Sequence, residues 1–240
     1  MSETPDQPRL LRALDATWPA AETRRLGPWT LRRGLGGGKR VSAASTDSPV
    51  TAADVTRAEA AMREFGQAPL FMLHEGNGAL DSMLEAHGYR IVDPVLMFVA
   101  PVDLPAGVET VPLNAIPSEE PLAMMAELWA RGGIGPARLA VMARARGPKT
   151  HLFSRFRDSP AGCAFVALDG DVAMLHALEV APEFRRDGVA RRIIGRAALW
   201  AREQGANWLA TVTTGENLPA QGLFSGIGMQ VAGKYHYRMK

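Results

Sequence analysis

The sequence is poor in cysteine and has little excess charge of either sign. Cys163 is the single cysteine among 240 residues, so an intramolecular disulfide cannot form and a reducing compartment fits. No Cys/His cluster has the spacing of a zinc site, and we expect no metal. The 27 basic and 25 acidic residues leave a formal net charge of +2. Overall charge therefore gives no strong attraction to nucleic acid or to a membrane surface.

Long apolar runs are also missing. None approaches the about 18 residues that a membrane-spanning helix requires. The first ten residues, MSETPDQPRL, are polar and acidic, whereas a signal peptide begins basic and becomes apolar. Apolar residues make up 47% and charged residues 22%, as in ordinary globular proteins. We therefore expect a cytoplasmic protein in which Cys163, within an apolar run, is a buried and inert thiol.

Helical and strand patterns alternate along the chain, which predicts an α/β (α+β) protein. Residues 101–107 are punctuated by proline and glycine and form the best candidate linker. This predicts two domains, 1–105 and 106–240. In the first, two strands at 28–33 and 39–45 would form a hairpin around a glycine-rich turn, and Thr51 would cap a helix. The second would begin with a strand at 108–113.

A weak internal repeat links the two halves. The segments Met83-Leu84-Glu85-Ala86-His87-Gly88-Tyr89 and Leu223-Phe224-Ser225-Gly226-Ile227-Gly228-Met229 both precede a strand. Each reads as the end of a helix, a glycine stop and a large apolar residue. The repeat indicates two related halves, and the alternative is a generic connection between a helix and a strand.

The stretch 175–204 has the pattern of an anion site. A strand ends at Val180, Pro182 interrupts regular pairing, and an amphipathic helix begins within residues 185–190. The first turn of a helix has unpaired N–H groups and the positive end of the helix dipole. Small residues at Gly188 and Ala190 would let a phosphate approach closely. The alternative is a solvated basic loop at the start of a core helix.

This stretch resembles motif A of the GCN5-related N-acetyltransferases (GNAT), with the family's Arg/Gln-x-x-Gly-x-Gly/Ala as Arg185-x-x-Gly188-x-Ala190. Matches to the helix that follows in the family occur downstream, at Asn217, Ala220, Leu223, Phe224 and Gly228. Residues 108–240 resemble the family's domain, which implies a mixed, splayed sheet with helices on both faces. The first half resembles the smaller, degenerate N-terminal domain of tandem family members.

The resemblance implies an acyltransferase that moves an acetyl group from acetyl-CoA to a primary amine in a ternary complex. The pyrophosphate of acetyl-CoA would lie on the 185–190 turn, and its pantetheine arm would lie along the preceding strand. The implied cofactor-binding residues are Leu178, Glu179, Val180, Arg185, Arg186, Asp187, Gly188, Val189, Ala190, Asn217 and Phe224. The competing interpretation is a non-catalytic or regulatory protein that binds acyl-CoA.

Four residues are candidates for proton transfer. His176 and Glu179 are candidate bases on one strand, where their spacing predicts opposite faces, so only one would enter the cleft. Each has a structural alternative, as a core histidine or as a solvated or ion-paired strand residue. Many family members carry a tyrosine where Phe224 stands, and a phenyl ring cannot donate a proton. Tyr235 and Tyr237 are two residues apart on one predicted strand and so face the same side. They could replace the missing tyrosine acid, or they could be half-buried aromatic residues of the sheet.

The remaining sequence features do not identify the acceptor substrate or the oligomeric state. Residues 34–40 only superficially resemble a P-loop, and a hairpin turn is favoured there. The arginine-rich 185–196 segment lacks interleaved aromatic residues, which argues against nucleic-acid binding. The acceptor is a small-molecule or peptide amine of unspecified identity, and a homodimer is among the open oligomeric states.

Overall fold

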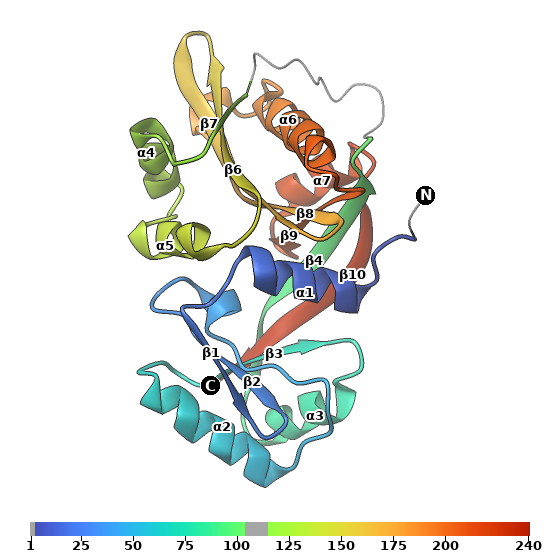
Figure 1. Ribbon diagram of the computed structural model, residues 1–240. Coiled ribbons are helices and arrows are strands. Elements are labelled where there is room, and N and C mark those ends of the chain that lie inside the picture. The colour runs from blue at the N-terminus through green and yellow to red at the C-terminus, as the bar shows by residue number, and fades with distance from the viewer. Residues whose placement is uncertain (1–2, 104–114) are drawn as a thin grey trace.

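The computed structural model describes residues 3–103 and 115–240, and Figure 1 shows its elements. The predicted strand at 108–113 and the second part of the predicted linker lie outside the described residues. In chain order the elements are α1 (Gln7–Thr17), β1 (Glu22–Leu26), β2 (Trp29–Arg33), η1 (Lys39–Val41), α2 (Ala52–Glu64), β3 (Leu70–His74), α3 (Gly78–Ala86), β4 (Arg90–Pro101), β5 (Ile116–Ser118), α4 (Ala123–Arg131), α5 (Pro136–Arg144), β6 (Lys149–Phe156), β7 (Ser159–Asp169), β8 (Val172–Val180), η3 (Pro182–Phe184), α6 (Val189–Glu203), β9 (Trp208–Thr214), α7 (Leu218–Ser225) and β10 (Gln230–Met239).

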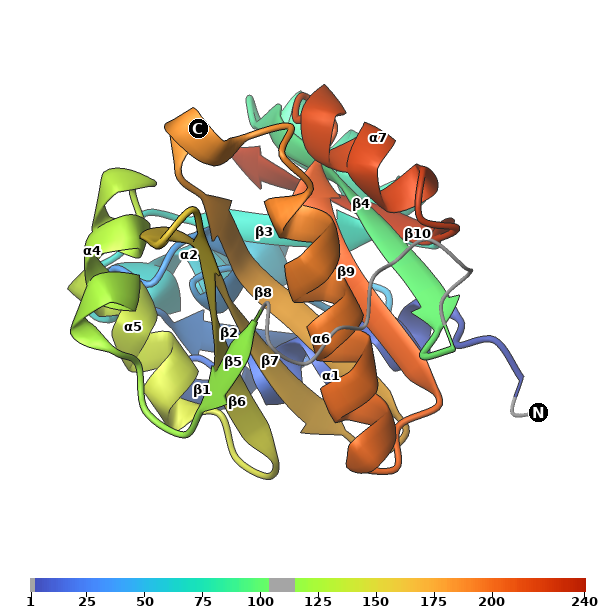
Figure 2. The same ribbon diagram turned by 90° about the horizontal axis from the view of Figure 1, so that it is seen from above.

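An eight-stranded mixed sheet organises the molecule, with the order β3-β10-β4-β9-β8-β7-β6-β5. Helices cover both of its faces, and alternate residues of β7 show why. Ala164 and Val166 pack with Ile193 of α6 on one face. Cys163 and Phe165 pack with α4 on the other face. Figure 2 shows α6 on one side of strands β6, β7 and β8, and α4 and α5 on the other side. The predicted mixed sheet with helices on both faces is confirmed.

The two halves of the chain share this sheet, because β4 of the first half lies between β9 and β10 of the second. The run β3-β10-β4-β9 is symmetric between the two halves of the chain. Strands β3 and β4 of the first half occupy positions equivalent to those of β9 and β10 of the second half. Both β4 and β10 follow a helix that stops at a glycine of positive φ, Gly88 at 82° and Gly228 at 84°. The large sheet therefore crosses the predicted 105/106 boundary, and β1 and β2 of the first half form a separate two-stranded sheet. The tandem origin stays a prediction.

The predicted hairpin of segments 28–33 and 39–45 is present only as one antiparallel bridge, between Thr30 and Ser45. The regular hairpin is formed by β1 and β2, and residues 39–41 form the short 3-10 helix η1. β1 has mostly exposed residues on both sides, so its sequence lacks the alternation that would have revealed it. The glycines of residues 34–38 serve close packing instead. A Cβ at Gly37 would come within 2.6 Å of Val141 in α5.

Candidate active site

Strands β8 and β9 separate partway along their length. Their parallel pairing runs from Val172 opposite Trp208 to Leu175 opposite Thr211. β8 continues to Val180, whereas no pairing with β9 beyond Leu175 is found in the described residues. The hydroxyl of Thr211 donates to the Leu175 carbonyl at 2.9 Å and so satisfies the last paired position. The far end of β8 therefore has backbone N–H and C=O groups facing the space between the strands.

A β-bulge lies at this point of β8. Cys163 of β7 is opposite Glu179 and Phe165 is opposite His176, so two β8 residues face the single Ala164 between them. Ala177 has a φ of 49°, and its carbonyl accepts a hydrogen bond of 2.8 Å from the Trp129 indole. The extra residue reverses the alternation. The prediction that His176 and Glu179 face opposite sides is wrong, because both lie on the face opposite α6.

The turn before α6 has the backbone of an anion site. Arg186 and Gly188 have positive φ values of 72° and 79°, and α6 begins at Val189. No side chain of the described residues caps this helix start, and its first turn contains no acidic residue. A Cβ built on Gly188 would meet nothing nearer than 4.0 Å, where Arg192 lies. The N–H groups of the first turn thus face open space.

Side chains on either side of this turn hold it in place. Arg185 donates to the Val180 carbonyl at 3.2 Å and pairs with Glu179 at 3.3 Å. Arg192 donates to the Asp187 carbonyl at 2.8 Å. The Arg186 and Asp187 side chains are exposed, whereas Leu178, Val180 and Val189 pack in the core beneath α6 and Ala190 is half-buried. The 185–190 segment therefore combines a fixed backbone with exposed positive charge.

Glu179 lies at the end of β8 nearest the turn. Its side chain is 19% exposed and is held by Arg185. A Cβ on Gly132, just after α4, would collide with the Glu179 carboxyl group, so the glycine lets the carboxyl group take this position. Sequence reasoning missed Gly132, since a glycine after a helix usually indicates nothing more than a helix stop.

His176 is a buried residue. It is 4% exposed, its Nε2 lies 2.8 Å from the Thr17 hydroxyl, and its ring stacks near Phe165 and Trp18. Burial, and then the charge of Arg40, hold the pKa of His176 well below its usual value. The imidazole is therefore neutral and out of reach of solvent in this structure.

Tyr235 and Tyr237 share a face, as predicted, with ring centroids 5.6 Å apart. Both are buried, at 2% and 3% exposure. Burial raises the pKa of Tyr237 well above its usual value, so its hydroxyl stays protonated. β4 separates their strand from β9. Two strands, β4 and β9, therefore lie between the strand of these phenols and β8 in the sheet.

The two predicted residues near α7 have clear structural roles. The Asn217 side chain caps α7 by accepting from the Ala220 N–H at 3.2 Å. Phe224 is 4% exposed and packs against Phe98, with ring centroids 5.4 Å apart. Position 224 therefore contributes a core ring beneath α6.

Within 3–103 and 115–240, no group of three or more His, Cys, Asp and Glu side chains is arranged to hold a metal ion. No helix in the part of the chain that the structure describes is long and apolar enough to cross a membrane.

Known proteins resemble this chain in sequence and fold. Residues 121–229 match the model of the Acetyltransferase (GNAT) family. An uncharacterised N-acetyltransferase, YobR of Bacillus subtilis, is 24% identical over 97% of this chain and 98% of its own length. A GCN5-related N-acetyltransferase from Kribbella flavida has a TM-score of 0.67 at 18% identity, covering 97% of this chain and 94% of its own. A tandem GNAT protein from the clavulanic acid pathway has a TM-score of 0.61 at 12% identity, covering 82% and 74%.

The comparisons support one class of protein. The solved structures share the GNAT fold, and the family match covers the segment that contains β8, the 185–190 turn and α6. Residues 121–229 thus resemble the Acetyltransferase (GNAT) family, and the described chain shares its fold with solved GNAT proteins.

Proposed function

We propose that this protein transfers an acetyl group from acetyl-CoA to a primary amine by direct attack in a ternary complex. The observation that carries the proposal is the uncapped first turn of α6 beside the separation of β8 and β9. Backbone N–H groups at a helix start bind phosphate, and an unpaired strand edge can pair with an extended amide-containing chain. In this protein the start of α6 follows the unpaired edge at the end of β8 after η3 and a short turn.

The residues present fit acetyl-CoA. Gly188 leaves open space over the turn, and Arg185 and Arg186 add positive charge for the pyrophosphate. The free backbone edge of β8, near Leu178 to Val180, suits the amides of the pantetheine arm. A backbone N–H near Val180 would polarise the thioester carbonyl.

We assign the general base to Glu179 and not to His176. An alkylamine, with a pKa of about 10, is mostly protonated at neutral pH and must lose a proton before it attacks. Glu179 is partly exposed at the end of β8, whereas His176 is buried and bonded to Thr17. The alkylammonium gives one proton to Glu179, the free amine nitrogen bonds to the carbonyl carbon, the carbon–sulfur bond breaks, and the second proton released by the nitrogen passes to the departed thiolate. The coenzyme A thiolate leaves readily without a tyrosine acid.

One observation favours a second function, an acyl-CoA-binding protein without fast turnover. Phe224 occupies the position where many family members have a tyrosine, and β8 itself carries no tyrosine. Transfer assays with added amines separate the two functions. The domain division, the cytoplasmic location and a homodimer remain predictions.

The cofactor site is tested with two matched glycine variants. Gly188 and Gly205 flank the two ends of α6 and both have positive φ, at 79° and 85°. Replacing either by tryptophan strains the backbone similarly, but only Gly188→Trp would fill the anion site. Calorimetry should show micromolar acetyl-CoA binding for the wild type and Gly205→Trp, and none for Gly188→Trp. Circular dichroism should show all three folded. Absence of wild-type binding would reject the proposed function.

A further inference from the structure

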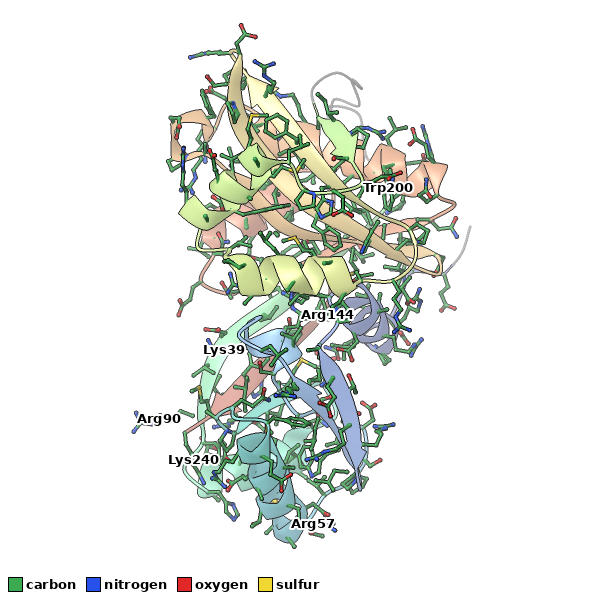
Figure 3. The ribbon with its side chains drawn as sticks, turned by 60° about the vertical axis from the view of Figure 1, so that its left-hand side comes forward. Lys39, Arg57, Arg90, Arg144, Trp200 and Lys240 are labelled. Carbon is green, nitrogen blue, oxygen red and sulfur yellow. The ribbon has the colours of Figure 1, made fainter. Side chains whose placement is uncertain are left out.

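A cluster of polar and aromatic side chains is enclosed where the two halves of the chain meet. At its centre is Arg40 of η1, whose neighbour Lys39 lies at this junction in Figure 3. The Arg40 guanidinium lies 3.5 Å from Nδ1 of His176, and 5.8 Å from the ring centre of Trp18. Tyr235 and Tyr237 of β10 are its electrostatic neighbours.

Arg40 has no negative partner in this enclosure. None of its nitrogens lies within 4.0 Å of a carboxylate among the described residues, whereas Lys39 beside it pairs with Asp93 at 2.7 Å. Its Nε is buried without a hydrogen-bond partner in the described part of the chain, and so is the Tyr235 hydroxyl. A half-buried cation whose neighbours are the neutral phenols of Tyr235 and Tyr237 is unfavourable unless an anion completes it. A neutral His176 adds no competing charge.

The cluster lies on the acceptor side of the proposed site. α6 and the phosphate turn cover one face of β8, and His176 and Glu179 project from the opposite face. His176 directly follows Leu175, where β8 and β9 separate. An acyl group held in the gap from the α6 side would therefore meet its acceptor on the face where Arg40 lies.

On the basis of the proposed function, we propose that Arg40, with Tyr235 and Tyr237, binds a carboxylate of the acceptor. The acceptor is then a small amine whose other end carries a carboxylate. Glu179 lies three residues beyond His176 on β8, roughly 10 Å or less at about 3.3 Å per residue. That spacing suits an amine at Glu179 and a carboxylate at Arg40 on one small molecule. The first half of the chain would thus supply acceptor specificity through η1.

The test compares acceptors that differ only in the carboxylate. Glycine, β-alanine and γ-aminobutyrate are each paired with methylamine, ethylamine and n-propylamine, and kcat/KM is measured with acetyl-CoA. The wild type should prefer the carboxylate member of at least one pair. Arg40→Gln should lower that preference by about 10- to 100-fold, the effect of losing a charge-assisted hydrogen bond. Arg90→Gln is the control, since Figure 3 shows Arg90 pointing away from the molecule. It should keep the preference.

The variant Tyr235→Phe distinguishes an effect on acceptor binding from an effect on protein stability. Because the Tyr235 hydroxyl has no hydrogen-bond partner within 3.5 Å among the described residues, its removal should change the melting temperature little. The same variant should raise KM for the carboxylate acceptor. Equal use of both members of every pair by the wild type, with acetyl-CoA bound, would overturn this inference and leave the proposed function standing. Loss of preference in Arg40→Gln and Arg90→Gln alike would also overturn it. Failure to bind acetyl-CoA would reject both.

Discussion

Replacing Glu179 by glutamine should lower kcat by about 10²- to 10⁴-fold, the usual contribution of a general base. Glutamine has nearly the same shape, so it should still fit beside Gly132 and accept a hydrogen bond from Arg185. The affinity for acetyl-CoA should change little, because the 185–190 backbone is untouched. Steady-state kinetics and calorimetry on one preparation measure both quantities.

Glu183 provides the matched control for Glu179. It is an exposed glutamate of η3, four residues further along the chain. Glu183→Gln removes the same charge near the same turn and should keep wild-type kcat. If Glu179→Gln also keeps wild-type kcat across the pH range, the proton is removed by another group and our assignment is wrong.

Replacing Ile193 by alanine should lower the free energy of unfolding by about 2–5 kcal/mol. Ile193 is fully buried on α6 and packs where β7 carries Gly162. A Cβ on Gly162 would lie 3.0 Å from the Ile193 side chain, which shows how closely the helix approaches the sheet. Shortening Ile193 would open a cavity there.

Thermal or denaturant unfolding measures the effect of Ile193→Ala. For a domain of this size, each kcal/mol shifts the melting temperature by about 2–4 °C. The control is Ile116→Ala, since Ile116 is 51% exposed on the edge strand β5 and should change stability by at most about 0.5 kcal/mol. Equal effects at both positions would contradict this description of the core beneath α6.

Local signals in the sequence located much of the site. The Thr51 cap is present as a capping box with Asp54, and the glycine stops at Gly88 and Gly228 end their helices as predicted. The helix predicted to begin within residues 185–190 begins at Val189. These features depend on neighbours within a few residues, so short patterns identify them.

Features that depend on distant partners were not predictable in this way. The bulge at Ala177 is fixed by Trp129, which is 48 residues earlier in the chain. The role of Gly132 depends on Glu179, and Arg40 meets His176 across 136 residues. The order of β3, β10, β4 and β9 is likewise set by contacts between the halves. No periodic pattern in one segment specifies such pairings.

The position of β4 between β9 and β10 has a consequence for folding during synthesis. β3 and β4 are translated more than a hundred residues before β10, yet β10 lies between them in the sheet. Until β10 leaves the ribosome, both strands keep unpaired backbone edges, which are prone to association with other chains. Long-range pairing of this kind slows folding. The first half of the chain should therefore depend on chaperones while the second half is being made.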